Sequence, residues 1–405
     1  MTRGARIAAR GAILAVALAA AVAVASNGLS TRLLASDPLR AARLSPGNAA
    51  FALAAAARLA GDDSGTRDPR VRRLVAAALS RSTSDPDAIA FRALEAGADG
   101  DPGREARLFR LSDEISRRNL PTRLWLIQDA VRRGDVAGAL ADFDIALRTS
   151  TDAPAILFPI LATATTDPTL SAPLAGLFDR PSDWRAAFFH FALTEGDAAA
   201  GLAHVVPAMR DRAWLAQNGV GEALVGRLVA DGDFAAARRT YGLFHREARS
   251  GPLVRDGDFG DPGASFPFGW LFAQKGEIGA ERSLIGGKPA LTYQALPGGD
   301  GAVASQLLML PPGRYRLALS AATAAADPQA PPYWTIACAS DGGKQIALLD
   351  MPVAEHGRAA ADFAVPPDCP AQWLVLTLRG SDQPGGQAGA VASVSVSRLD
   401  RTGNA

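Results

Sequence analysis

Between Arg314 and Ser320 the chain reads Arg-Tyr-Arg-Leu-Ala-Leu-Ser, with its large apolar side chains at every second position. This alternation is typical of a β-strand that buries one face. The segment Ser-Val-Ser-Val-Ser at 393–397 alternates in the same way. Such short strands, separated by turns and without a helical run between them, predict an antiparallel β-sandwich. Further strand-like runs lie at residues 290–295, 302–310, 333–339, 345–350, 358–365 and 372–378.

The sequence before this region has a different period. Over residues 36–250 the apolar residues recur every three or four positions, which predicts α-helices joined by short loops. The predicted fold class is therefore multidomain α + β. We expect a membrane or signal helix within residues 1–30, an α-helical repeat solenoid over residues 36–250, and the antiparallel β-sandwich over residues 251–400.

The first 30 residues resemble an export segment. Arg3, Arg6 and Arg10 precede an uncharged, mostly apolar run from Gly11 to Ala25. This order is typical of a secretory signal peptide, and the small residues that end the run suit cleavage. If residues 26–29 extend the run, it is long enough to remain as a membrane anchor. Both alternatives export the rest of the chain to the periplasm, either released or tethered to the inner membrane.

The composition excludes several classes of protein. Apolar residues make up 48% of the 405 residues, which is enough for sizeable cores, and the 20% of charged residues are too few for a disordered chain. The net charge of +1 argues against a nucleic-acid partner. The sequence has no nucleotide-binding loop, nucleophile elbow or zinc-protease motif. No pair of carboxylates stands out as a glycosidase site. We therefore expect a protein that is not an enzyme and has no cofactor.

Cys338 and Cys369 are the two cysteines of the chain. In an exported protein, a lone pair of cysteines within one domain usually forms a disulfide. Cys338 lies in the strand-like run 333–339, and Cys369 lies in a proline-rich loop just before the run 372–378. We expect the two to be bonded. The alternative is that they are two separate small core residues.

Three Gly-Asp pairs, Gly134-Asp135, Gly196-Asp197 and Gly232-Asp233, each separate two amphipathic helices, and small residues such as Gly201 follow them at similar offsets. A pair of helices needs a small residue where the two cross closely. The offsets resemble those of the tetratricopeptide repeat, with the best match over Leu120–Pro154. This resemblance implies a surface for protein partners. An irregular solenoid of helix pairs is the alternative.

The second half of the chain carries a series of short motifs. They are Asp-Gly-Asp-Phe at 256–259, Phe-Gly-Trp at 268–270, Ser-Gln-Leu at 305–307, the run Leu310–Leu317 and a closing strand at Ala390–Leu399. In this order they resemble the jelly-roll carbohydrate-binding modules of the galactose-binding-domain-like group. The resemblance covers most of residues 251–399 and implies a sugar-binding fold. In that group an acidic residue commonly follows the Phe and helps to hold calcium. Here that position is Gly260. Asp256, Asp258 and Asp261 could still offer oxygen ligands, but their spacing fits no calcium loop, and we expect no metal.

Strand alternation indicates which aromatic rings face away from the core. In the run 372–378 every second residue is Leu, so Trp373 points to the other side, and Tyr333 is placed in the same way in its run. Sugar rings stack on such aromatic faces, while amides bind their hydroxyl groups. Each ring could instead cover an edge of the core or pack against the helical domain. The predicted ligand-binding residues are Tyr333, Trp373 and Trp270, with Gln306 or Gln372 as polar partners.

Together these features predict an exported, non-catalytic envelope protein. Its helical repeats would bind a protein partner and its jelly roll would bind polysaccharide, in a pathway of polysaccharide synthesis or export. One alternative is a structural cap that binds no sugar. Another is a polysaccharide hydrolase with its site at the junction of the two domains.

Overall fold

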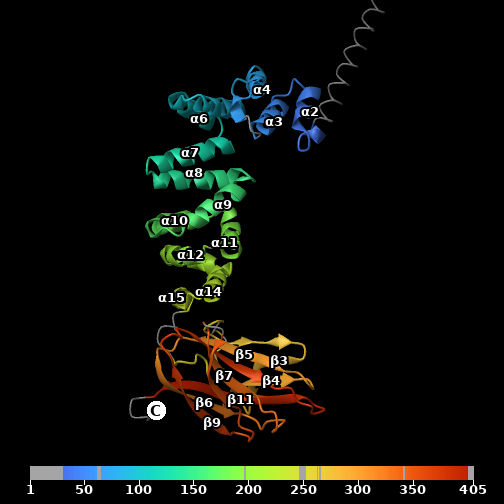
Figure 1. Ribbon diagram of the computed structural model, residues 1–405, viewed down its shortest axis with the longest axis vertical. Helices are drawn as coiled ribbons and strands as arrows, with labels where there is room; N and C mark the ends of the chain where they lie inside the picture. The colour runs from blue at the N-terminus through green and yellow to red at the C-terminus, as the bar shows by residue number, and fades with distance from the viewer. Residues whose placement is uncertain are drawn as a thin grey trace, which may run out of the picture. The chain divides into compact units, whose positions relative to one another are not determined.

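The computed structural model describes residues 31–61, 65–195, 198–245, 252–261, 263, 266–340 and 343–399. Helices occupy the described part up to Phe244, and strands the part from Leu271 onwards (Figure 1). The chain is therefore a mixed α + β protein, as its two periodicities predict. The signal or anchor predicted in residues 1–30 lies outside the described residues, and so does the Gly196-Asp197 pair. Among the helices of the described part, none combines the length and apolar character that crossing a membrane requires.

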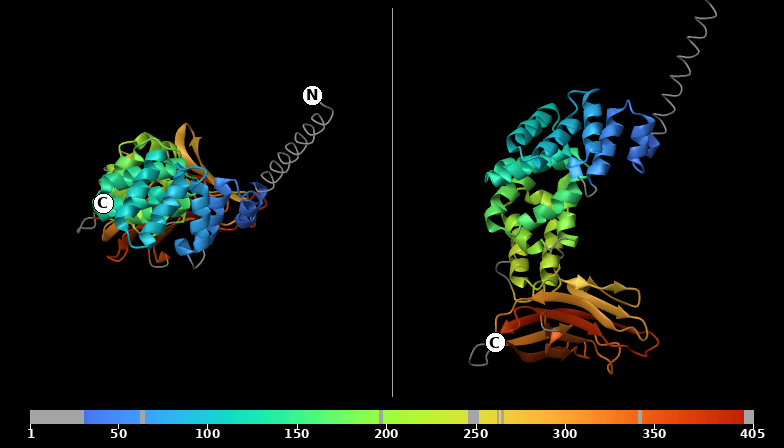
Figure 2. Two further views of the ribbon diagram at one scale, coloured as in Figure 1. Left: turned by 90° about the horizontal axis from the view of Figure 1, so that it is seen from above. Right: turned by 45° about the horizontal axis from the view of Figure 1, so that its top comes forward.

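Consecutive helices of the described chain pack side by side in pairs: α3 with α4, α5 with α6, α7 with α8, and α14 with α15. Figure 2 shows these pairs from two further directions. The pairing agrees with helix–turn–helix units, while the tetratricopeptide assignment and the solenoid stay predictions. The helices are α2 (Pro38–Leu44), α3 (Ala49–Ala60), α4 (Pro69–Leu79), α5 (Pro86–Ala98), α6 (Pro102–Ile115), α7 (Leu120–Arg132), α8 (Val136–Thr149), α9 (Ala153–Ala164), α10 (Ser171–Phe178), α11 (Trp184–Thr194), α12 (Ala199–Val205), α13 (Arg212–Gln217), α14 (Val220–Ala230) and α15 (Phe234–Phe244), with 3-10 turns at Gly65–Arg67, Pro168–Leu170 and Val206–Ala208.

Aspartate caps explain where several helices begin. Asp68, Asp85 and Asp101 each precede a proline, and each carboxylate accepts a hydrogen bond from a backbone N–H in the first turn of α4, α5 or α6. The proline occupies the first helical position, where its missing N–H costs no intrahelical bond. The Asp-Pro pairs are therefore the starts of helices.

Two of the three Gly-Asp pairs, both within the described residues, form tight corners between helices. Gly134 and Gly232 have φ angles of +70° and +79°, in the left-handed region that favours glycine. Asp135 and Asp233 follow directly and cap α8 and α15 by accepting the N–H three residues on. One residue thus ends a helix and the next begins another, which is why these loops can be so short.

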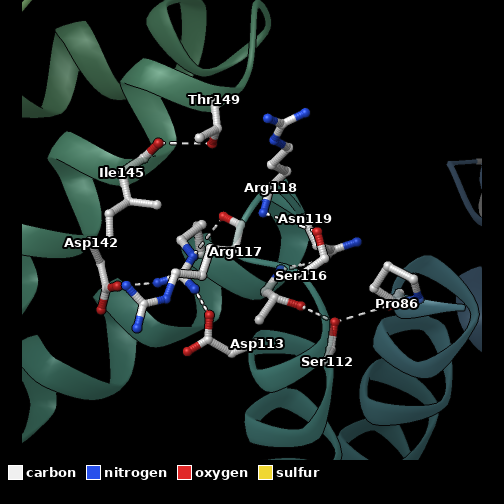
Figure 3. Close-up of polar contacts among 12 residues, drawn as sticks. Pro86, Ser112, Asp113, Ser116, Arg117, Arg118, Asn119, Asp142, Ile145 and Thr149 are labelled. Carbon is white, nitrogen blue, oxygen red and sulfur yellow. Dashed lines mark hydrogen bonds and ion pairs between the residues drawn. The ribbon is translucent and has the colours of Figure 1, made fainter. Parts of the chain in front are cut away.

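A buried arginine joins three consecutive helices of the first half. The Arg123 side chain of α7 is only 2% exposed and forms ion pairs with Asp113 of α6 and Asp142 of α8. In Figure 3 Asp113 and Asp142 lie on different helices, and the Arg117 carbonyl accepts a further hydrogen bond from the Arg123 guanidinium. A buried charge is tolerated when it is paired in this way, and removing one partner is strongly destabilising. The network therefore ties the α7–α8 pair to α6 of the preceding pair.

Packing divides the chain into two compact units. The first comprises Met1–Leu161 and Gly176–Phe188, and the second comprises Ala162–Ala175 and Phe189–Ala405. The second unit therefore holds α12 to α15 together with the strands. Within it, Gly201 lies against Thr165, because a Cβ atom at Gly201 would stand 2.6 Å from the Thr165 carbonyl carbon. The backbone just after α9 therefore passes close to Gly201, whereas the sequence predicts a close approach between the two helices of one pair.

The strands form two antiparallel sheets, which we call sheet A and sheet B. Sheet A has the strand order β1 (Leu271–Phe272), β5 (Gly301–Leu308), β10 (Gln372–Leu378), β7 (Tyr333–Cys338), β8 (Gln345–Asp350). Sheet B has the order β2 (Gln274–Lys275), β3 (Ile278–Ile285), β4 (Lys288–Ala295), β11 (Gln387–Arg398), β6 (Gly313–Ala321), β9 (Arg358–Val365). The sandwich core lies between their inner faces.

Alternation along each strand builds this core. On β6 the side chains of Tyr315, Leu317 and Leu319 are buried, as the period of two predicts, and Trp334 is fully buried on β7. The predicted disulfide between Cys338 and Cys369 is confirmed, with a Cα–Cα distance of 5.4 Å. It ties the end of β7 to the loop before β10.

Helix α15 packs on the sandwich within the second unit. Tyr241 is buried, and its ring centroid lies 5.0 Å from that of Phe268. Arg238 stands 5.1 Å over the same Phe268 ring, and His245 stacks on Tyr241 at 4.1 Å. Burial, together with the nearby Arg255 charge, lowers the pKa of His245. The last helices and the β-sandwich thus share one aromatic contact.

Candidate functional site

Trp270, predicted to stack on a sugar, lies in the sandwich core. Its ring is 5% exposed and packs edge-on against Trp334 at 5.7 Å. The indole N–H donates a hydrogen bond of 2.8 Å to the Asp256 carbonyl. Trp270 therefore holds the start of the sandwich in place, and its ring offers no face to a ligand.

Both predicted glutamines are buried as well. The Gln306 side chain accepts the Arg255 N–H and donates to the Arg255 carbonyl, both at 2.8 Å, as a neighbouring strand would. Gln372 accepts the Leu310 N–H at 2.9 Å and donates to the Cys369 carbonyl at 2.7 Å. These amides satisfy backbone groups inside the protein. They have no reach to solvent and cannot bind the hydroxyl groups of a sugar.

Tyr333 and Trp373 do lie on the outer face of sheet A, but each ring already has a partner. The Arg379 guanidinium stands 4.4 Å over the Tyr333 ring and is held by Asp350 at 2.6 Å. Trp373 stacks nearly parallel to Phe266, with ring centroids 5.8 Å apart. The rings are also separate, because Tyr333 is paired with the residue four positions beyond Trp373 on β10, about 13 Å along the strand. Sheet A therefore offers two partly covered rings and no continuous aromatic platform.

The outer face of sheet B carries a groove of about 570 Å³ over β3, β4 and β11, which we call the Gln294 groove. Its floor consists mostly of small residues. Gly279 and Ala388 flank Gln294 in one cross-strand row, and Thr292 and Ala390 stand beside Glu281 in the next. Longer side chains rise around this floor. The lining includes Gln274, Gly279, Glu281, Ser283, Ile285, Thr292, Gln294, Thr323, Ala388 and Ala390.

The Gln294 groove is suited to hydrogen bonding. Glu281 and Gln294 are exposed, and within the residues that the structure describes neither side chain has a hydrogen bond or an ion pair. An ionised carboxylate accepts hydrogen bonds and an amide both donates and accepts, which matches the hydroxyl groups of saccharides. Tyr293 also borders the groove, but its ring is buried and burial raises its pKa to about 12. The groove is therefore polar, with no ring face presented to a ligand.

A second hollow, of about 460 Å³, lies on the same face of sheet B over β11, β6 and β9, and we call it the Arg358 hollow. Its floor is again small, because Ser395, Ala318 and Ala360 form one cross-strand row. Arg358 is exposed at its rim, paired in register with Ser320. In the described part of the chain the Arg358 side chain has no hydrogen bond or ion pair.

The two hollows approach each other along β11. The Gln294 groove includes Ala388 and Ala390, and the Arg358 hollow includes Ser393 and Ser395. Between them Ala390 packs with Ala290 and Ala322 in a small apolar cluster. The backbone after β6 runs beside β11 here, where the Ala322 N–H donates to the Ala390 carbonyl at 2.8 Å. Sheet B thus presents two polar hollows, with a buried cluster of small apolar residues between them.

One of the aspartates near the start of the sandwich, Asp256, already has protein partners. Asp256 bonds to the Arg282 guanidinium at 2.7 Å and accepts the Asp261 N–H, also at 2.7 Å. Its carboxylate is therefore committed to the fold. Across the ranges that the structure describes, no three His, Cys, Asp or Glu side chains gather as a metal site would require.

Comparison with solved structures finds a likeness over about a third of the chain. No protein-family model matches the chain, and no curated protein matches it. Among solved structures, a carbohydrate-binding module of family 4 is 16% identical, covering 36% of this chain and 99% of its own, with a TM-score of 0.28. A module of family 61, solved in complex with β-1,4-galactotriose, is 13% identical, covering 37% and 99%, with a TM-score of 0.25. The xylan-binding domain CBM22-1 of Paenibacillus barcinonensis is 13% identical, covering 32% and 85%, with a TM-score of 0.24. The C-terminal β-sandwich of this chain resembles carbohydrate-binding modules.

Proposed function

We propose that this chain is an exported, non-catalytic protein whose β-sandwich binds a saccharide in the Gln294 groove of sheet B, while its helical half binds a protein partner in polysaccharide synthesis or export. The observation that carries the saccharide site is the groove itself: a hollow of about 570 Å³ with a floor of small residues and free amide and carboxylate groups at its rim. A shallow polar surface of this kind fits a ligand rich in hydroxyl groups.

The expected affinity is low. Hydrogen bonds to exposed side chains replace bonds to water, so each contributes little net free energy. The groove presents no aromatic face, and the stacking energy that aromatic platforms supply is absent. We expect dissociation constants from millimolar to high micromolar, which correspond to binding free energies on the order of −4 to −6 kcal/mol.

A blocking substitution tests the site. Ala388 is exposed on the floor of the Gln294 groove, so Ala388→Trp fills the groove without disturbing the core. Ala302→Trp is the matched control, because Ala302 is equally exposed but stands on the outer face of sheet A beside Thr377. On a glycan array, followed by titration of the best binder, the first variant should lose binding and the second should keep it. The reverse result would assign the ligand to the face that carries Tyr333 and Trp373.

Export is supported by the basic and apolar order of residues 3–25 and by the disulfide, because disulfides persist in oxidising compartments. A reporter that is active only in the periplasm, fused after residue 35, should be active. N-terminal sequencing of the mature protein then separates a cleaved signal from a membrane anchor. An active cytoplasmic reporter at the same position would refute export.

A second candidate function, a structural cap, is favoured by the contact of Tyr241 with Phe268. In that case the sandwich closes the end of the helical half and binds no sugar. A folded chain that binds no saccharide on the array supports the cap. The proposal of a non-catalytic protein is tested separately, by incubation with a panel of polysaccharides and analysis for released fragments.

A further inference from the structure

The charges of sheet B point to the class of saccharide, and this inference rests on the proposed function above. On the outer face of β6 and β9 stand Arg314, Arg316 and Arg358, and the one acidic residue among them is Asp362. Three positive charges and one negative charge leave a local excess of two. Arg316 is held by Asp362 at 2.7 Å, a bond that also lowers the pKa of that carboxyl. Arg358 is exposed, and it borders the hollow.

The Gln294 groove carries the opposite sign. Glu281 is exposed at its rim, and within the described ranges no cation pairs with it. A carboxylate on a ligand is repelled there and attracted at the Arg358 hollow. The planar guanidinium matches a carboxylate with two parallel N–H donors, and such charge-assisted bonds are the stronger ones. The two hollows therefore differ in the charge of the sugar that each accepts.

The distance between the hollows sets the length of the ligand. From Ala388 to Ser395 along β11 there are seven residue steps, about 23 Å of strand. A single sugar cannot reach both hollows, whereas a linear chain of several sugars can. Between the hollows Ala290, Ala322 and Ala390 are buried in a small apolar cluster, so this stretch presents none of their side chains to the ligand and the contacts lie in the two hollows.

We propose that the ligand is a linear acidic polysaccharide, laid along β11 across both hollows, with a sugar carboxylate bound by Arg358 and an uncharged sugar in the Gln294 groove. Binding is to the interior of the chain, because both hollows are open to the surface of the sheet. A polysaccharide with carboxylates at intervals fits better than one with a carboxylate on every sugar, because Glu281 repels a carboxylate in the Gln294 groove.

The test uses the full-length protein and three probes in titration calorimetry. Partly methyl-esterified polygalacturonate oligomers supply acidic pyranoses at intervals, the full methyl esters supply the same backbone without charge, and polyglutamate supplies the charge without sugar. We expect the oligomers to bind more tightly than the other two. Arg358→Gln should weaken binding of the acidic oligomers about threefold to tenfold and leave binding of the esters nearly unchanged. Glu281→Gln should strengthen binding of the acidic oligomers.

Lys344→Gln is the matched control, because it removes one exposed positive charge from the sandwich at the edge of sheet A, away from both hollows. It should not change the affinity. Equal binding of acid and ester, equal binding of polyglutamate, or no effect of Arg358→Gln overturns the acidic assignment. The proposed function still stands if Ala388→Trp abolishes binding of the neutral ester. If no saccharide depends on Ala388, the proposed function fails as well. All of these side chains are exposed, so an unchanged melting temperature confirms that each variant folds.

Discussion

Three glutamines show how one residue type takes different roles in this protein. Gln306 and Gln372 are buried and complete the hydrogen bonding of backbone groups, whereas Gln294 is exposed at the rim of the groove. All three lie on strands, and the sequence analysis selects the first two because amide groups bind the hydroxyl groups of sugars. Side-chain chemistry alone does not separate a ligand contact from an internal bond. Burial decides, and burial depends on strands that are distant in the sequence.

Removing the buried Gln306 should therefore lower stability, whereas removing the exposed Gln294 should weaken binding. Gln306→Ala leaves the Arg255 N–H and carbonyl without their partner, and we expect a loss of about 2 kcal/mol in the free energy of unfolding. Gln294→Ala should change stability by less than about 0.5 kcal/mol and weaken saccharide binding. Chemical denaturation and titration of both variants check this. A stable Gln306→Ala protein with impaired binding would show instead that Gln306 is a ligand-binding residue.

Tyr293 gives stability a dependence on alkaline pH. Burial raises its pKa from 10.0 to about 12, so the folded protein retains the phenolic proton that the unfolded chain releases. The contribution of this group is fully present below pH 10 and is lost as the pH rises to about 12. The loss amounts to about 3 kcal/mol. In the Tyr293→Phe variant this part of the decline should be missing. Urea titrations of both proteins between pH 9 and 12 measure the difference, and parallel curves would contradict it.

Among the elements, strands with one apolar face could be predicted, whereas β3, one of the three strands under the groove, could not. β6, β7 and β10 alternate clearly, so their positions follow from the sequence. β3 carries polar residues on both faces: Glu281 and Ser283 line the groove, while Arg282 turns inward to Asp256. Its pattern has no clear period of two. The groove could not be predicted either, because its floor depends on cross-strand rows that only the strand register reveals.

The disulfide should contribute strongly to the stability of the sandwich. Cys338 and Cys369 are 31 residues apart, and closing a loop of this length stabilises the fold by about 4 kcal/mol in the chain-entropy model. Replacing both cysteines with serine should lower the free energy of unfolding by about that amount. Denaturant unfolding of the double variant measures it, with the reduced wild-type protein as the control. If reduction and substitution both leave the midpoint unchanged, the loop is held by its other contacts.

At the scale of the molecule, the division into compact units does not follow the change in secondary structure. The second unit begins at Ala162 and includes α12 to α15, although strands begin only at Leu271. Tyr241 covers Phe268, and Phe266 covers Trp373. Periodicity identifies where helices give way to strands. It carries no information on which side chains cover the end of the sandwich, and so the boundary of the unit could not be predicted.

The two possible fragments should therefore differ in stability. Residues 162–399 keep Tyr241 on Phe268, whereas residues 252–399 expose that ring to water. We expect the shorter fragment to be less stable by about 2 kcal/mol, the value of burying one large apolar side chain. Thermal unfolding of both fragments tests this, and Tyr241→Ala in the longer one should reproduce most of the loss. Equal melting temperatures would show that the helices add nothing to the sandwich.

The shared aromatic contact also bears on how such a chain can be recombined. A gene exchange that joins a new sandwich at residue 250 would separate Phe268 from the helix that shields it. The new sandwich would then have no ring in the place where Phe268 packs on Tyr241. An exchange at residue 162 would carry both partners together. The segment that can be exchanged as one unit is therefore larger than the β-sandwich, and relatives that keep this sandwich should also keep the helices that directly precede it.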